Sequence, residues 1–156
     1  MRKAEREVVG IENFYNIALN GDVIILAFNN GDYPYILPVN YGCELKNNNL
    51  YFYFHGALEG SKYAYIYDNA KLSFEIDCNH ELIVKYDKGY CTMAYDSIIG
   101  KGVLRELKNY DEIYNALDIL VKHHHKDDGF KFNPAAISRT RVFEIKARSI
   151  TGKSKK

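Results

Sequence analysis

The first periodic stretch of the sequence is typical of an amphipathic helix. Apolar residues at positions 11, 14, 15, 18 and 19 share one helical face. The pair Asn20-Gly21 follows and suits a helix end, because both residue types tolerate positive φ. Residues 23–28 are a continuous apolar run, short enough for a buried strand, and residues 29–32 have the composition of a hairpin turn. We therefore expect a helix followed by a β-hairpin.

Alternating apolar positions predict two further strands. Residues 35–45 place apolar side chains on one face, whereas Pro34 and Pro38 belong to the other face. Because proline has no N–H, this strand cannot be hydrogen-bonded normally along both edges. Residues 50–55 alternate again after a turn. We expect the strands at 23–28, 35–45 and 50–55 to form a three-stranded antiparallel meander.

The second half of the sequence predicts more strands and a second amphipathic helix. The expected elements are a short helix at about 61–67, strands at 71–77, 82–86, 92–107 and 143–147, and a helix with apolar positions between 113 and 121. Gly100 and Gly102 predict a bulge or a close backbone approach in the longest strand. The polar tail 151–156 is expected to be frayed. Without βαβ alternation, residues 1–156 are predicted to be one domain, a mainly β antiparallel barrel with appended helices.

Composition excludes several classes of protein. The formal net charge is +1, from 21 basic and 20 acidic residues, whereas a nucleic-acid binder needs a basic excess on one face. No apolar run is long enough to span a bilayer, and no signal-peptide stretch follows the charged start. The three widely spaced cysteines, Cys43, Cys78 and Cys91, favour free thiols in a reducing compartment. We expect a cytoplasmic protein with no nucleic-acid or membrane partner.

The segment between the third strand and the short helix carries the clearest candidate chemistry. A strand ends at His55, Gly56 and Gly60 let the backbone turn, and a helix is expected to begin with Ser61 and Lys62. Free N–H groups at a helix start favour an anion, and a nearby ammonium group adds a full charge. This is the chemistry of a phosphate site. The alternative is a plain strand-to-helix turn with an exposed lysine.

The remaining histidines and cysteines predict no further site. Consecutive helical residues point about 100° apart, so the run His123–His125 cannot jointly bind one ion, and we expect no metal. Cys43 and Cys91 are expected to be buried small hydrophobes. His55 ends an apolar strand and needs a hydrogen-bond partner, which is either a ligand or a neighbouring backbone group.

Three ordered segments resemble the pyridoxamine 5′-phosphate oxidase-like flavoproteins, and especially their 5-nitroimidazole-resistance branch. The segments are 35–42, 50–62 and 97–102, and the chain ends 1–7 and 150–153 resemble the same branch. The resemblance implies an FMN-binding split β-barrel that forms a homodimer with the cofactor at the subunit interface. It also implies a reductase of small planar nitro-aromatic compounds, in which the flavin supplies the redox chemistry and no catalytic side chain is needed. The alternatives are a non-catalytic flavin-binding protein and a split barrel that binds haem.

The same resemblance implies the residues that contact the cofactor. One strand passes its backbone along the flavin ring, one turn lies near the ribityl phosphate, and one segment lies near the ring, in some members from the partner subunit. In that order, the implied residues are Leu37, Pro38, Val39, Asn40 and Tyr41; His55, Gly56, Ser61 and Lys62; and Ser97 and Ile98. Ser61 stands where a basic residue is common, so phosphate binding would depend more on Lys62.

Overall fold

The computed structural model describes residues 4–125 and 129–156, so Met1, Arg2 and Lys3 lie outside the described residues. One antiparallel sheet has the strand order β3-β2-β6-β7-β8-β5-β4, with β1 added beside β8. The strands are β1 (Glu7–Val8), β2 (Val23–Phe28), β3 (Tyr35–Asn40), β4 (Gly42–Lys46), β5 (Asn49–Ala57), β6 (Lys71–Lys85), β7 (Tyr90–Leu107) and β8 (Thr140–Lys155). The predicted class, mainly β with appended helices in a split barrel, is confirmed.

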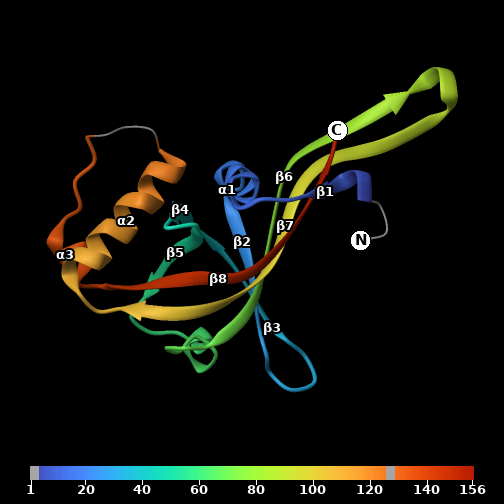
Figure 1. Cartoon of the computed structure of the whole chain (residues 1–156). Helices are drawn as coiled ribbons and strands as arrows, with labels where there is room; N and C mark the ends of the chain where they lie inside the picture. The colour runs from blue at the N-terminus through green and yellow to red at the C-terminus, as the bar shows by residue number, and fades with distance from the viewer. Residues whose placement is uncertain (1–3, 126–128) are drawn as a thin grey trace.

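The helices are α1 (Ile11–Asn20), α2 (Tyr110–His124) and α3 (Pro134–Ile137), and single 3₁₀ turns are η1 (Ala4–Arg6), η2 (Ser61–Ala64) and η3 (Tyr86–Lys88). One helix, α1, packs its residues Ile17 and Ala18 into the barrel core, whereas α2 lies beside β4 and β5 (Figure 1). Both predicted amphipathic helices are confirmed as α1 and α2. Among residues 4–125 and 129–156, no helix combines the length and the apolar character that crossing a membrane would need.

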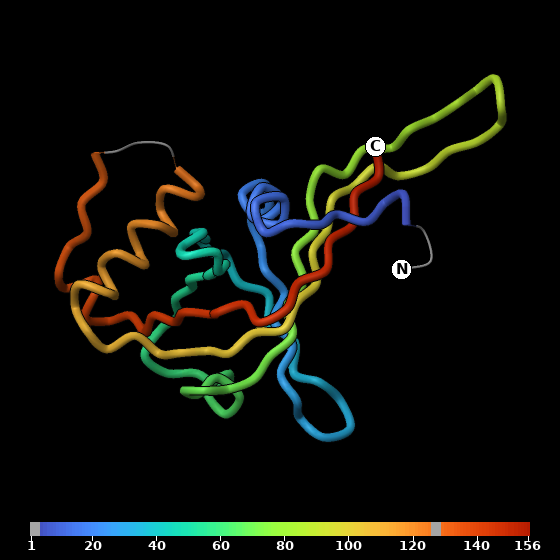
Figure 2. The backbone as a smooth tube through the Cα atoms, in the orientation of Figure 1, coloured from blue at the N-terminus to red at the C-terminus, as the bar shows by residue number. Residues whose placement is uncertain are grey.

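The three long strands β6, β7 and β8 hold the sheet together. β7 pairs with β6 and β8 along most of its length, whereas β8 pairs with β5 near its start and with β1 near its end. These strands curve around an apolar core that includes Phe52, Phe74 and Phe143. Beyond the barrel, β6 and β7 continue as a two-stranded hairpin that projects from the body (Figure 2). The sheet is therefore built on strands much longer than the apolar runs that predicted them.

The strand predicted over 35–45 is two strands, and the predicted meander is wrong. β3 ends at Asn40 and pairs with β2, whereas β4 begins at Gly42 and pairs with β5. The two strands stand at opposite ends of the sheet order, although only Tyr41 separates them along the chain. Because the sheet does not close between β3 and β4, the barrel is split at this point.

Tyr41 is fully buried and fixes the break between these strands. Its hydroxyl donates a hydrogen bond to the Ala18 carbonyl oxygen at the end of α1, at 2.5 Å. Its own carbonyl oxygen accepts a hydrogen bond from His124 Nε2 of α2, at 2.9 Å. The Tyr41 ring also packs edge-on against Phe52, with the ring centroids 5.7 Å apart. One residue therefore joins the strand break to both long helices and to the core.

Two glycines allow close approaches between elements. A β-carbon on Gly42 would lie 2.6 Å from backbone atoms of Leu120, so α2 rests directly on the start of β4. A β-carbon on Gly100 would lie 2.2 Å from Phe74 Cζ and 2.7 Å from the Ser149 carbonyl oxygen. The predicted close approach at Gly100 is confirmed, and a bulge follows between positions 101 and 102.

Several predicted boundaries are wrong, because a strand extends as far as its backbone pairs with a neighbouring strand, whether or not its side chains follow an apolar pattern. The strands predicted at 71–77 and 82–86 are one strand, β6, with a bulge at Asn79, whose φ is 56°. The tail 151–156 is not frayed, because β8 continues to Lys155 and pairs with β7 and β1. The short helix is only the four-residue turn η2. Cys43 is buried as predicted, whereas Cys91 is exposed.

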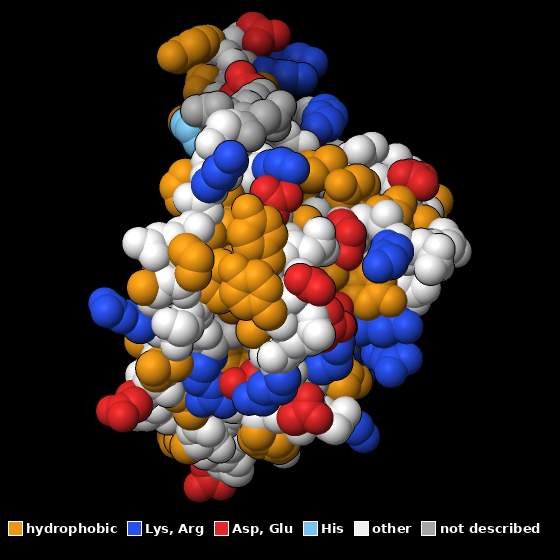
Figure 3. Space-filling view, turned by 90° about the vertical axis from the view of Figure 1, so that its left-hand side faces the viewer, with side chains coloured by type: hydrophobic (Ala, Val, Ile, Leu, Met, Phe, Trp, Pro, Cys, Tyr) orange, Lys and Arg blue, Asp and Glu red, His pale blue; other side chains and the backbone are white. Residues whose placement is uncertain are grey.

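An aromatic surface covers the outer side of α2. Four rings follow one another, with centroid separations of 6.4 Å from Tyr110 to Tyr114, 5.5 Å from Tyr114 to Phe132 and 5.0 Å from Phe132 to Phe130. Figure 3 shows apolar side chains gathered at the centre of the face that carries α2. These contacts hold the segment before α3 against the helix.

We expect Tyr41→Phe to lower the free energy of unfolding by about 1–3 kcal/mol. The substitution keeps the buried ring but leaves the Ala18 carbonyl, one of the last of α1, without its donor. Urea unfolding would measure the change. Tyr33→Phe is the matched control, because Tyr33 is 82% exposed, and it should stay within about 0.5 kcal/mol of the parent. Equal effects of both substitutions would contradict a structural role for this hydroxyl.

Candidate functional site

The turn between β5 and η2 brings a lysine over a glycine. A β-carbon on Gly56 would lie 2.9 Å from Lys62 Nζ and 2.6 Å from the Tyr63 hydroxyl oxygen. The Tyr63 hydroxyl donates a hydrogen bond to the Ala57 carbonyl, which ties the turn to the end of β5. Gly60 has a φ of 153°, which favours glycine, and this lets the chain fold back over β5. The Lys62 ammonium therefore lies over the backbone of Gly56, which has no side chain.

An ion pair between Glu106 of β7 and Arg141 of β8 packs against this turn. The Arg141 guanidinium lies 3.9 Å from the centre of the Tyr63 ring, and it donates two hydrogen bonds to Glu106, at 2.7 and 2.9 Å. These bonds from Arg141, with a further contribution from Lys108, lower the pKa of Glu106 to about 2. Glu106 thus balances Arg141, and this leaves Lys62 as the cation of the turn without a carboxylate partner among the described residues.

The histidine at the end of β5 lies beside the same lysine. The His55 side chain is exposed at the surface, but the protein atoms around its ring lower its pKa, and the charge of Lys62 lowers that pKa further. Within the described part of the chain, its side chain makes no hydrogen bond, so the backbone partner that we considered is not formed. The expected helix N-terminus is missing, because η2 is one 3₁₀ turn. An anion at this turn would therefore depend on the charge of Lys62 rather than on a helix dipole.

The strand expected to pass along the flavin ring is β3, and it is an edge strand that lies beside this turn. β3 is hydrogen-bonded only to β2, so its other edge is open. Tyr35 at its start stacks on Tyr65, just after η2, with the ring centroids 4.1 Å apart. Leu37 and Val39 pack against the core, whereas Pro38 and Asn40 face outward. The fully buried Tyr41 ring belongs to the core, so its side chain cannot reach a ligand.

The third predicted segment lies apart from the other two within one chain. Ile98 is fully buried, and its backbone pairs with Ile76 on one side and Gly152 on the other. Ser97 is half-buried and faces outward. Leu107 and His55 both pair with Val142, and Ser97 lies ten residues before Leu107, which is roughly 33 Å measured along the curved strand β7. One chain therefore brings together residues 35–40 and 55–63 but not Ser97.

Two histidines at the end of α2, His123 and His124, bond to backbone carbonyls of neighbouring segments. His123 Nε2 donates to the Gly21 carbonyl oxygen at 2.7 Å, and its Nδ1 lies 3.8 Å from Cys43 Sγ. Because Nε2 carries the proton, Nδ1 is the acceptor for the thiol. Burial lowers the pKa of His123 and raises the pKa of the Cys43 thiol to about 12, so both groups are neutral. In residues 4–125 and 129–156, no three metal-binding side chains gather.

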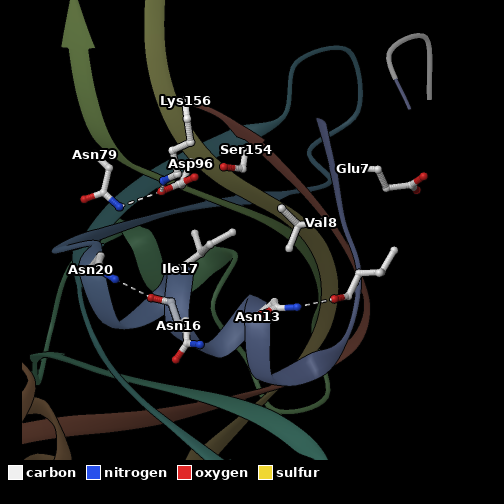
Figure 4. A pocket seen from close by; sticks show the side chains of 11 residues that line it. Glu7, Val8, Asn13, Asn16, Ile17, Asn20, Asn79, Asp96, Ser154 and Lys156 are labelled. Carbon is white, nitrogen blue, oxygen red and sulfur yellow. Dashed lines mark hydrogen bonds and ion pairs between the residues drawn. The ribbon is translucent and has the colours of Figure 1, made fainter. Parts of the chain in front are cut away.

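A polar cavity of about 520 Å³ between α1 and the ends of β6, β7 and β8 holds none of these residues (Figure 4). Its buried carboxylate, Asp96, accepts hydrogen bonds from Asn79 Nδ2 and Lys156 Nζ, both at 2.8 Å. On α1, the amides of Asn13 and Asn20 donate to backbone carbonyls. These polar groups that line the cavity are therefore satisfied by partners within the protein, on α1 and on the sheet separately.

The sequence of this chain matches a known protein family. A family model described as pyridoxamine 5′-phosphate oxidase matches residues 14–154. A search of curated proteins found no match.

Solved structures share the fold at low sequence identity. A candidate 5-nitroimidazole antibiotic resistance protein from Bacteroides thetaiotaomicron has a TM-score of 0.78 and 23% identity, covering 94% of this chain and 85% of its own. An FAD and heme binding protein from Mycobacterium smegmatis has a TM-score of 0.78 and 12% identity, covering 97% and 74%. An FAD-binding protein from Mesorhizobium loti has a TM-score of 0.64 and 18% identity, covering 97% and 98%.

Proposed function

The chain belongs to the pyridoxamine 5′-phosphate oxidase family, and on this basis we propose that it binds a flavin, FMN, at the turn over Gly56 and along β3. The observation that carries the proposal is the position of Lys62. Its ammonium lies over a residue without a side chain and has no carboxylate partner in the described part of the chain. A phosphate fits this place, because a charge-assisted bond to a fixed ammonium is among the stronger polar contacts.

The open edge of β3 supports the same proposal for the ring end of the cofactor. Pro34 and Pro38 remove two backbone donors, which makes this edge a poor template for another strand. The stacking of Tyr35 on Tyr65 holds the start of β3 next to η2, so one planar ligand with a phosphate arm could contact both.

We propose that the chain is a reductase of small nitro-aromatic compounds, as the 5-nitroimidazole-resistance branch implies. A bound flavin supplies the electron transfer. The residues of the chain bind the phosphate, orient the ring and keep water from it, so no nucleophile or general base is required. The three free cysteines agree with the cytoplasmic location proposed from the sequence.

We also propose a homodimer that completes the site. Outward side chains form an apolar row of Pro38, Ile25 and Ile99 that is interrupted by Glu75, because Pro38 pairs with Ile25, Ile25 with Glu75, and Glu75 with Ile99. Ile25 is 38% exposed and Ile99 57%, and a partner seated on this face would remove that apolar area from water. Ser97 lies beside this row and far from His55 in its own chain, so it would reach the cofactor from the partner.

We expect Lys62→Ala to weaken FMN binding roughly tenfold or more and riboflavin binding little. Riboflavin lacks the phosphate, so it cannot lose a contact with Lys62. Fluorescence titration of both ligands measures the difference. Lys88→Ala, a surface lysine on the projecting hairpin, is the control and should change neither affinity. Equal losses for both ligands would remove Lys62 from the phosphate site.

We expect Ile99→Lys to convert a dimer into a monomer of 18.0 kDa in light scattering. On association a lysine at position 99 would lose its water, and its cross-strand neighbour Glu75 would offset only part of that cost, whereas an isolated chain keeps the lysine in water. Tyr110→Lys on α2 replaces a similarly exposed side chain, 53% against 57%, outside the row and should remain dimeric. A parent protein that is monomeric at micromolar concentration and still binds FMN would refute the proposed interface.

With FMN and a reductant, the protein should reduce a 5-nitroimidazole to its amine faster than an equal concentration of free FMN, because binding brings ring and substrate together. An anaerobic assay with the product identified by mass spectrometry tests this, with Lys62→Ala as the cofactor-depleted comparison. A flavin absorption spectrum without a Soret band separates this function from haem binding. If amine formation does not exceed that of free FMN with several donors, only flavin binding is retained.

A further inference from the structure

A groove on the outer face of the sheet is lined by three basic side chains. It has a volume of about 360 Å³ and lies over β2, β6, β7 and β8. Lys71, Lys101 and Arg148 line it, together with the polar side chains of Asn29 and Ser73. Lys101 falls within the segment 97–102 that resembles the flavoproteins, but none of these residues is among those expected to contact the flavin.

A β-bulge brings Arg148 into this groove. Lys101 pairs with Ser149, and the next residue of β7, Gly102, pairs with Ala147, so Arg148 is the extra residue of β8. Bulges of this kind change the direction of a side chain and occur next to binding sites. Lys101 also pairs with Ser73 of β6, which places the Ser73 hydroxyl in the same register row.

The three cations of the groove have no acidic partner. No carboxylate lines the cavity, and Lys71, Lys101 and Arg148 form no ion pair with any described residue. Elsewhere in the chain, Arg105 and Arg141 are each paired with glutamates. Like charges that share a groove repel one another, and a bound anion removes that cost.

A second cavity continues the groove toward an aromatic end. Its volume is about 540 Å³, and Asn29 and Lys71 line both cavities. Tyr65 and Tyr67 line its other end, and Tyr67 is 60% exposed. This cavity also lacks a carboxylate. The combined groove therefore offers cations at one end, amides at its centre and, at the other end, the exposed ring of Tyr67 beside the half-buried ring of Tyr65.

We propose that this groove binds a phosphorylated nucleotide, with its phosphates among Lys71, Lys101 and Arg148 and its planar base against the tyrosines. Arg and Lys pair with phosphate oxygens, and aromatic rings stack on bases. This groove uses neither the open edge of β3 nor Lys62, and it shares with the proposed flavin site only Tyr65, which stacks on Tyr35. A nicotinamide dinucleotide belongs to this ligand class.

Calorimetric titration of the flavin-free protein with NADPH at low salt tests the proposal. NADPH should bind saturably, and Lys71→Ala, Lys101→Ala or Arg148→Ala should each weaken binding about tenfold. Lys85→Ala on the projecting part of β6 is the matched control and should change the affinity less than twofold. Raised salt should weaken binding to the parent protein. The thermal midpoint of each variant shows that the fold is retained, and Lys101→Gln repeats the loss of charge at nearly constant side-chain length.

Adenosine and inorganic pyrophosphate divide the ligand into its two parts. Each should bind at least tenfold more weakly than NADPH, because each can contact only one end of the groove. No saturable binding of NADPH, or the same affinity in the groove variants and the parent, overturns the proposal. Pyrophosphate that binds as tightly as NADPH removes the nucleotide assignment. A loss of FMN binding in Lys101→Ala that matches the loss in Lys62→Ala would make this groove part of the flavin site and overturn a second ligand.

Discussion

The buried hydrogen bond from the Tyr41 hydroxyl to the Ala18 carbonyl is the constraint on which the rest of the structure depends. It anchors the one residue between β3 and β4, at the place where the chain leaves one end of the sheet and enters the other. Because His124 bonds the Tyr41 carbonyl, both long helices meet at this point. The surrounding core excludes water, so a lost bond there could not be replaced. The split of the barrel, and hence the free edge of β3, follows from this arrangement.

The free edge in turn determines what the surface of the protein can bind. An edge that continued into a neighbouring strand would leave no room for a ligand beside β3. With the edge open, the stacked pair Tyr35 and Tyr65 connects it to the turn that holds Lys62. The outward face of β2, β6 and β7 carries two different surfaces, the apolar row that includes Ile99 and the basic groove at Lys101. Two outward residues of β7, Ile99 and Lys101, thus carry the two proposed surfaces, one for self-association and one for an anion.

Local patterns predicted the local features of this fold, whereas relations between strands could not be predicted. The helical periodicity of α1 and α2 is contained in each segment, and the glycines around Lys62 marked a turn in advance. Alternation continues through Tyr41, so only the pairing partners reveal a break there. The polar residues 151–156 are a strand because β7 and β1 lie beside them. The basic groove was missed because Lys71, Lys101 and Arg148 come together through register and a bulge, and neither is visible in one segment.

The three partners of β8 have a consequence for how the protein is made. β8 pairs with β1, the first strand of the chain, and with β5 and β7, all of which precede it in synthesis. The barrel cannot close until β8 has left the ribosome, and until then β5 and β7 each present an unpaired edge. Long-range pairing of this kind also slows folding, because loop entropy is lost before the contacts form. The newly made chain therefore passes through a period of exposure to aggregation that ends only when its last strand inserts between the others.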